Sequence, residues 1–470
     1  MELQQILDSI LQDASAVRSE LVLMGGAISI LLMGLYKPKL IVLKGIFAIV
    51  LAAAWLFANK TSGYYFFNQW RIDDISVFLK YLLTITGLLL LLFKDRKKYN
   101  AEYYFLMLSV FVGSFLMLSA YHFLLVYLAV EITSYASYFL TGWEEKKKSI
   151  EGTVKYYLFG AVSSAVMLFG MSLVYGDTGS LYFTGVKTGL GEVGVGLLLV
   201  GLLFKTSVAP FHIWSPGAYQ VGPTQSVALF SVVPKLAAFG LIYHLSQIYL
   251  SGEIGSMLLL LAIFSIIFGT LSALRQQNVK RLLAYGAVAH SGFLLPLVVF
   301  PMDMMQQAFA IYAVIYAIMN VAVFYLVDLH EEGKELNMER LSGLGKMYPY
   351  AGAAWVIILI ALTGLPPTAG FTAKFYLFSA VWSLWVLEGD SLLMVFFVVG
   401  IISSAVSLFY YLKVPYYYFF KEQKYHSTRI IHVHTLIATF FAILLLLMFI
   451  QPDILNIFVF ENRVFDPSTP

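Results

Sequence analysis

The sequence predicts an all-α integral membrane protein with about 14 transmembrane helices. Its 470 residues are 60% hydrophobic and 12% charged, and their mean hydropathy is +0.80, which is far too apolar for a soluble globular protein. The apolar stretches are long enough to cross a hydrocarbon core of about 30 Å as helices. They lack the alternation of polar and apolar residues that is typical of strands in an outer-membrane barrel.

Windows of about 19 residues locate the individual helices. The N-terminal segment predicts a short interfacial helix, because one helical face collects Leu3, Ile6, Leu7, Ile10 and Leu11. The predicted spans that follow are 19–36, 39–58, 74–93, 103–120, 122–142, 153–175, 193–211, 224–250, 254–274, 282–300, 305–328, 350–387, 392–420 and 429–451.

Two of these spans are predicted to be broken. The seventh contains Ala209-Pro210, and the twelfth contains Leu365-Pro366-Pro367 and is too long for one straight helix. Paired broken helices in two halves of a membrane protein indicate internal repeats. We therefore divide the chain into 1–98 (interfacial helix and spans one to three), 99–250 (first repeat), 251–420 (second repeat) and 421–470 (last span and C-terminal tail).

The loop charges predict the orientation in the membrane. Alternate loops lie on opposite sides, and the cytoplasmic set collects Lys and Arg. Most of the 30 Lys and Arg residues fall in one alternate set, and the other side has Arg18, Lys60, Arg71, Lys187 and Arg463. We expect the basic loops to be cytoplasmic and both termini to lie outside the cytoplasm.

The absence of cysteine limits the chemistry of this chain. Without a thiolate it supplies no ligand for an iron–sulfur cluster, no zinc-thiolate site and no disulfide. The sequence also shows no P-loop and no arrangement of a nucleophile with a base. We therefore expect no redox centre, metal site or catalytic residue within the chain.

The candidate functional residues are charges inside apolar stretches. Four lysines, Lys155, Lys205, Lys235 and Lys374, and one carboxylate, Glu131, lie within predicted spans. A charge near the bilayer midplane costs roughly 2.5–3.5 kcal/mol even on lenient scales, so such residues usually pair, titrate or line a wet path. The alternative is a structural counter-ion or a side chain that snorkels to the interface, which we favour for Lys80 and Lys413.

These residues form a predicted proton path. Glu131 and Lys155 each lie roughly halfway along consecutive spans, which allows an intramembrane ion pair. The four lysines could form a row in the bilayer plane, with His290 between Lys235 and Lys374 as a group that titrates near neutrality. His212, just past the first break, could connect the row to the cytoplasmic side.

Four motifs carry a resemblance to a known family. FKTSVAPFHIWSPGAY, SVVPKLAAF, KRLLAYGAVAHSGF and LTGLPPTAGFTAKFYLF, in this order, resemble the antiporter-like subunits of bacterial NADH:quinone oxidoreductase, respiratory complex I, and are most similar to the subunit N type. Lysine at 374 and the end of the chain soon after the last span distinguish it from the M and L types. Gly217 is a departure, because relatives commonly have aspartate after Trp-x-Pro, and it puts a proton-entry role for this loop in doubt.

The resemblance implies a fold and residue roles. It implies two inverted five-helix repeats with broken helices 7 and 12, in the bacterial inner membrane. It makes Glu131 the carboxylate of span five and Lys155 its partner in span six. Lys205 and Lys374 become the lysines of the broken spans, and Lys235 becomes the lysine that links them.

The implied function is proton translocation as a membrane subunit of complex I. NADH, FMN, iron–sulfur clusters and quinone are then expected on partner subunits, so the chain takes part in an enzyme without holding its redox centres. The alternatives are a subunit of a multisubunit cation/proton antiporter or of a membrane-bound hydrogenase, and a structural scaffold with an inactive proton path.

Overall fold

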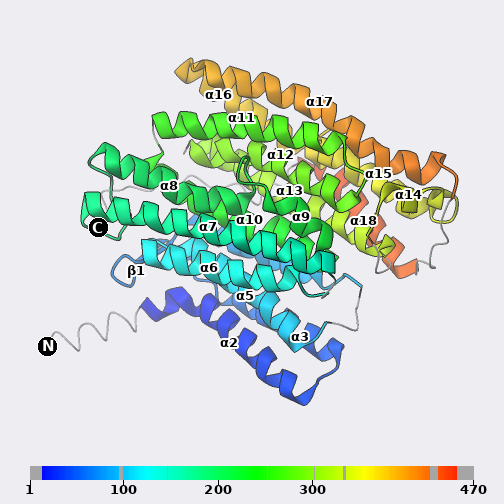
Figure 1. Ribbon diagram of the computed structural model, residues 1–470, viewed down its shortest axis with the longest axis horizontal. Helices are drawn as coiled ribbons and strands as arrows, with labels where there is room; N and C mark the ends of the chain where they lie inside the picture. Colours follow the sequence, from blue (N-terminus) through cyan, green and yellow to red (C-terminus); the bar gives the residue numbers. More distant parts are fainter. Residues whose placement is uncertain are drawn as a thin grey trace.

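The computed structural model describes residues 13–94, 99–144, 147–250, 252–300, 302–331, 335–423 and 432–452 (Figure 1). Within these ranges the chain is almost entirely helical, which confirms the predicted fold class. The face predicted for the interfacial helix, Leu3 to Leu11, lies outside the described residues.

The N-terminal part contains three long helices and one hairpin. Its elements are η1 (Ala14–Val17), α2 (Arg18–Met33), η2 (Gly34–Tyr36), α3 (Leu40–Leu56), β1 (Gly63–Tyr65), β2 (Trp70–Ile72) and α4 (Asp74–Leu90). The two strands pair antiparallel, with Gly63 opposite Ile72. Asp73 begins α4 through a capping box, because its side chain accepts from the Ser76 amide while the Ser76 hydroxyl accepts from the Asp73 amide.

The central part contains the first break. Its elements are α5 (Ala101–Ser119), α6 (Phe123–Thr141), α7 (Lys147–Thr178), α8 (Gly189–Thr206), α9 (Trp214–Val221) and α10 (Thr224–Tyr249). The predicted seventh span, 193–211, is helical only to Thr206, the end of α8, and α9 begins after it, beyond residues 207–213. This interruption follows from the proline at position 210, which has no amide proton to donate.

The C-terminal part contains the second break. Its elements are α11 (Glu253–Leu274), α12 (Val279–Val299), α13 (Asp303–His330), α14 (Met338–Leu341), η3 (Leu344–Lys346), α15 (Pro349–Thr363), α16 (Ala369–Glu388), α17 (Ser391–Phe420) and α18 (His432–Ile450). The predicted twelfth span is interrupted between α15 and α16, at the two prolines.

Every predicted span coincides with a helix or with a broken pair. Among the described residues, twelve helices are long and apolar enough to cross a membrane, and α3 and α15 are shorter apolar helices. The total of fourteen spans, the inverted repeats and the four segment boundaries stay predictions.

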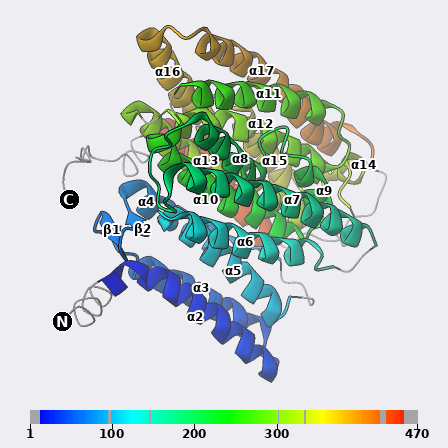
Figure 2. The ribbon, with the colours of Figure 1, turned by 60° about the vertical axis from the view of Figure 1, so that its left-hand side comes forward.

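The helices run side by side, with α2 and α3 at one edge of the bundle and α16 and α17 at the other (Figures 1 and 2). Between them α10, α12 and α13 form the buried centre, and every residue in the most apolar window of α10 is buried. A polar residue within this window of α10 is therefore surrounded by protein.

The bundle has two distinct ends. We define the ribbon end by β1, β2 and the start of α4. There, Trp70 forms an isolated β-bridge with Ala120, which follows α5, and His122 forms another with Tyr182, which follows α7. At the opposite end, the basic end, Lys94 follows α4 and donates to the Leu329 carbonyl on α13. These contacts connect loops that the charge pattern assigns to the same side.

Candidate functional site

The first helix break positions Lys205 in the last turn of α8. The helix ends at Ser207, which adopts a left-handed conformation with φ of 58°. Side chains from neighbouring helices satisfy the freed backbone groups: Ser291 Oγ donates to the Thr206 carbonyl at 2.5 Å, and Ser265 Oγ accepts from the Ala209 amide at 2.6 Å. The break is thus held by α11 and α12.

Lys205 is buried without a hydrogen-bond partner. It is 3% exposed, and its ammonium lies 5.9 Å from the centre of the Tyr138 ring. Within the described ranges neither Lys205 Nζ nor the buried Glu131 Oε1 has a hydrogen-bond partner, yet the two charges interact electrostatically. Because buried polar groups are normally satisfied, this pair requires water or rearrangement between its members.

The predicted ion pair between Glu131 and Lys155 is wrong. The Lys155 ammonium lies 2.5 Å from Glu151, one turn earlier on α7, and its side chain is 64% exposed. The physical reason is that α7 begins at Lys147, so Lys155 lies near the helix end, on a face that also exposes Val154 and Leu158. Glu131 instead interacts electrostatically with Lys205, without a direct ion pair between them among the described residues.

Lys235 lies at the centre of α10. It is fully buried, its Nζ has no hydrogen-bond partner among the described residues, and it lies 5.9 Å from the Tyr219 ring. Nothing in the sequence distinguishes Tyr219 from the chain's 30 other tyrosines.

A chain of aromatic rings joins the surroundings of Lys205 to those of Lys235. Its centroid distances are 4.7 Å from Tyr138 to Tyr156, 4.3 Å from Tyr156 to Trp214 and 6.2 Å from Trp214 to Tyr219. This chain spans α6, α7 and α9, so it forms only when the broken helix is folded against its neighbours.

His290 on α12 lies in the second half of the row. Its Nδ1 shares a hydrogen bond of 2.8 Å with the Tyr312 hydroxyl, and it interacts electrostatically with both Lys235 and Lys374. His290 is thus within electrostatic range of both lysines, and its position between them in a proton path stays a prediction.

The second break positions Lys374 on α16. Its ammonium donates to the Thr363 carbonyl at 2.7 Å and to Ser404 Oγ at 2.8 Å, and lies 4.7 Å from the centre of the Phe293 ring. Gly364, with φ of 83°, lets the chain turn here, and a Cβ at this position would lie 2.4 Å from Lys374 Cδ.

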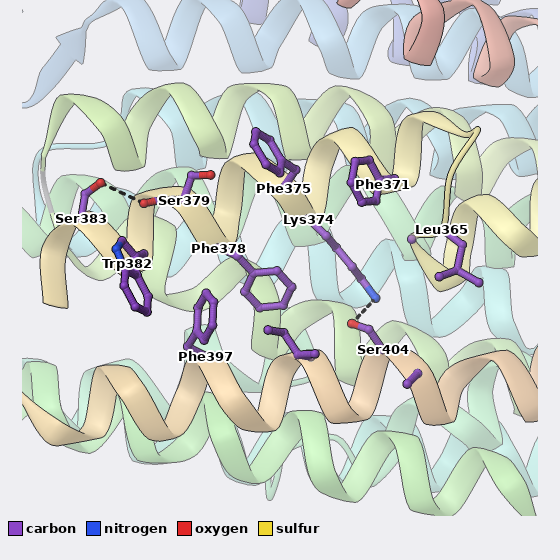
Figure 3. A pocket seen from close by; sticks show the side chains of 13 residues that line it. Leu365, Phe371, Lys374, Phe375, Phe378, Ser379, Trp382, Ser383, Phe397 and Ser404 are labelled. Atoms are coloured by element: carbon purple, nitrogen blue, oxygen red, sulfur yellow. Dashed lines mark hydrogen bonds between the residues drawn. The ribbon is translucent and has the colours of Figure 1, made fainter. Parts of the chain in front are cut away.

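Lys374 also lines a cavity of about 570 Å³ between α16 and α17 (Figure 3). The other walls include the aromatic side chains of Phe371, Phe375, Phe378 and Trp382. Phe375 and Trp382 are exposed, so the cavity opens on the outside of the bundle. Lys374 thus lies beside an opening on the outside of the bundle.

His212 lies within the first break and packs against α11 and α12. Its ring is 4.6 Å from Phe268 and 6.3 Å from Tyr285. The residue is 7% exposed, and its Nδ1 has no hydrogen-bond partner in the described part of the chain. Its contacts are therefore aromatic, and a route from it to the basic end stays a prediction.

Sequence reasoning missed an ionic cluster at the basic end. Lys280, counted as a loop residue, lies in the first turn of α12, where it donates to Glu331 at 2.7 Å and to the Gly222 carbonyl at 3.0 Å. Glu331 also accepts from the Thr224 hydroxyl at the start of α10. The motif KRLL gave no sign that its first lysine is buried.

Comparisons with known proteins identify the family of the chain. A family profile described as "NADH:quinone oxidoreductase/Mrp antiporter, TM" matches residues 120–403. Subunit N 2 of the NADH-quinone oxidoreductase of Chloroherpeton thalassium is 31% identical over 444 residues, covering 87% of this chain and 86% of that protein. Subunit N from Rubrobacter xylanophilus is 34% identical over 389 residues, covering 77% and 78%.

Solved structures share the fold. A chain of respiratory complex I from Thermus thermophilus superposes with a TM-score of 0.81 at 28% identity and covers 93% of this chain and 97% of its own length. A chain of an archaeal membrane-bound sulfane sulfur reductase, at 21% identity, has a TM-score of 0.83 and shows the fold alone. The chain therefore belongs to the family of membrane subunits that NADH:quinone oxidoreductases share with Mrp antiporters, and it is similar over most of its length to subunit N.

Proposed function

We propose that this chain is the subunit N type of proton-translocating membrane subunit in NADH:quinone oxidoreductase. Protons move along Glu131, Lys205, Lys235, His290 and Lys374, while electrons pass from NADH to quinone on other subunits. The observation that carries the proposal is the burial of three lysines, two of them at helix breaks, none of which bonds to a carboxylate in the part of the chain that the structure describes. An ammonium in such surroundings is poised to exchange its proton.

The remaining expectations form part of the same proposal. The complex lies in the bacterial inner membrane, with the basic end of the bundle in the cytoplasm. Peripheral and membrane partner subunits hold FMN, the iron–sulfur clusters and the quinone site. Lys155 drops out of the buried row because its ammonium is exposed and paired with Glu151.

Replacing Lys205 tests the proposal. In inverted membrane vesicles that contain the whole complex, Lys205→Met should abolish most proton pumping per NADH oxidised while the complex still assembles. Lys205→Arg should also impair turnover, because a guanidinium is effectively always protonated. The matched control is Lys155→Met, an exposed lysine of the same half, which should pump normally.

Two outcomes contradict the proposal. Normal pumping by Lys205→Met would show that the row is misassigned. Purification of the native assembly without flavin or iron–sulfur subunits, together with NADH-independent exchange of cations for protons, would favour the antiporter alternative.

A further inference from the structure

Four side chains form a polar cluster at the ribbon end, which we call the outer cluster: Arg71, Asp73, His244 and Gln247. Arg71 Nη2 donates to Gln247 Oε1 at 2.9 Å and lies 3.1 Å from Asp73 Oδ2. His244 Nε2 lies 2.9 Å from the same Asp73 oxygen. The cluster therefore brings β2, the start of α4 and the end of α10 together.

The outer cluster leads from the surface into the interior. Gln247 is exposed, Arg71 is 5% exposed, Asp73 is 7% exposed, and His244 is fully buried. A buried imidazole is thus connected to the surface by two intervening charged groups. Neither ring nitrogen makes a well-aligned hydrogen bond among the described residues, although Nε2 lies 2.9 Å from Asp73 Oδ2. Nδ1 is therefore open to a water molecule or a proton donor on the inner side.

The two oxygens of Asp73 have different partners. Oδ1 accepts a hydrogen bond from the Ser76 amide at 2.8 Å and caps α4. Oδ2 contacts Arg71 Nη2 and His244 Nε2. Burial acts to raise the pKa of Asp73, but its contacts with His244 and Arg71 more than offset burial and hold the pKa well below its usual value. The carboxylate therefore stays charged and can stabilise a proton on His244.

The outer cluster lies further along α10 than Lys235 and, about two and a half turns away, on the opposite face of the helix. His244 is nine residues after Lys235 on the same helix, an axial separation of about 13 Å. Gln306 on α13 donates to the Tyr243 hydroxyl at 2.6 Å, and the same helix carries Tyr312, the partner of His290. Polar contacts between α13 and its neighbours thus extend from the row toward the outer cluster.

The face of α10 that carries His244 is closed one turn further in, at Gly240. A Cβ at Gly240 would lie 2.5 Å from Leu118 and 2.7 Å from Leu79, so α10 packs tightly against α4 and α5 there. A proton that moved between Lys235 and His244 would have to pass on the α13 side.

We infer that the Asp73–His244 pair is a proton-transfer site that connects the lysine row to the aqueous phase at the ribbon end. His244 gains and loses the proton, and Asp73 stabilises its charged form. This inference rests on the proposed function, because it assigns the far end of the same proton path.

Charged and titratable side chains near His244 come from α4, β2 and α10. Asp73 and Arg71 face it from α4 and β2, and Tyr243 adjoins it on α10, with a ring distance of 6.0 Å. Arg71 in turn lies 5.9 Å from the Tyr121 ring. On α4 the ammonium of Lys80 lies 2.6 Å from Glu20 of α2, and both side chains are almost fully buried.

Two substitutions test the inference in the whole complex. His244→Gln keeps a polar side chain but cannot titrate near neutrality. Asp73→Asn removes the charge and keeps the helix cap, because Asn caps as well as Asp. The matched control replaces both partners of the nearby ion pair, Glu20→Gln with Lys80→Met, and thereby removes two buried charges that are outside the path.

The measurement is the proton yield per NADH as a function of the pH at the ribbon end. Both test variants should lower the yield partly and lose its dependence on the pH at the ribbon end, while the complex assembles. The control should change at most the amount of complex. If His244→Gln does not assemble, Asp73→Asn decides the question.

The outcomes separate this inference from the proposed function. The inference alone would be overturned if His244→Gln kept the native yield and the native pH profile while Lys205→Met was impaired. If His244→Gln does not assemble, the same result in Asp73→Asn would overturn it. An equal loss at every pH would also overturn it, because it would indicate a structural role. Normal pumping by Lys205→Met would overturn the proposed function itself.

Discussion

Glu131 and Lys205 show how burial changes the energetic coupling between two charged side chains. Removing one partner of a buried pair leaves the other charge uncompensated, whereas an exposed pair such as Lys155 with Glu151 contributes little. The first pair should therefore be energetically coupled, and Glu131 should be independent of Lys155.

A double-mutant cycle measures this coupling. Glu131→Gln and Lys205→Met should be non-additive by about 0.5–3 kcal/mol in the free energy of unfolding in detergent. Glu131→Gln with Lys155→Met is the control and should be additive within about 0.5 kcal/mol. Coupling in the control would restore the pairing of Glu131 with Lys155 that the sequence predicts. Additivity in the test pair would show that Glu131 and Lys205 do not interact.

Gly364 provides a second test at the scale of a residue. Gly364→Ala should destabilise the protein more than Gly389→Ala does. Both glycines have positive φ, 83° and 69°, so alanine at either costs about 1–2 kcal/mol. At Gly364 the added Cβ also meets the Lys374 stem, whereas at Gly389 it meets nothing within 4 Å. Equal losses of thermal stability would show that the stem moves away freely.

At the scale of an element, the two breaks are folded structures rather than gaps in helices. Trp214 Nε1, from the start of α9, donates to the Phe204 carbonyl of α8 at 2.8 Å. The indole thus bridges the break and also stacks on Tyr156. Loss of this bridge should loosen the connection between the two half-helices.

Trp214→Phe isolates the hydrogen bond because phenylalanine keeps an aromatic ring in the stack. We expect it to lower the free energy of unfolding by about 0.5–1.5 kcal/mol more than Trp355→Phe does. Trp355 is also buried, but its Nε1 has no hydrogen-bond partner among the described residues. Thermal unfolding of the two variants in the same detergent makes the comparison, and equal losses would mean that the bridge contributes nothing.

At the scale of the whole molecule, the two ends of the bundle should face different compartments. The chain has no cysteine, so single cysteines can be labelled without background. Thr184 at the ribbon end and Glu422 at the basic end are both exposed. The excess of basic residues predicts that Thr184→Cys reacts with an impermeant maleimide in cells with a permeable outer membrane.

Glu422→Cys should react only after the inner membrane is opened. The reverse order would invert the orientation and place the outer cluster in the cytoplasm. Labelling of both positions in intact cells would contradict the assignment of the two ends to opposite sides.

The sequence by itself determined the fold class, the helix positions and the breaks. These depend on local properties: continuous apolar stretches must form helices in a bilayer, and the prolines at 210, 366 and 367 interrupt them wherever the neighbouring helices lie. The same local reasoning placed Lys205, Lys235 and Lys374 inside apolar spans, and the structure shows all three buried.

Tertiary structure alone decided which of these charges meet. Lys155 and Lys205 look alike in the sequence, but the side of the helix on which each lies, and the neighbour packed there, leave one exposed and the other buried. His244 and Asp73 are far apart in the chain and gave no common signal. Their contact, like that of Glu20 with Lys80, depends on how distant helices pack, which hydropathy along a single helix does not specify.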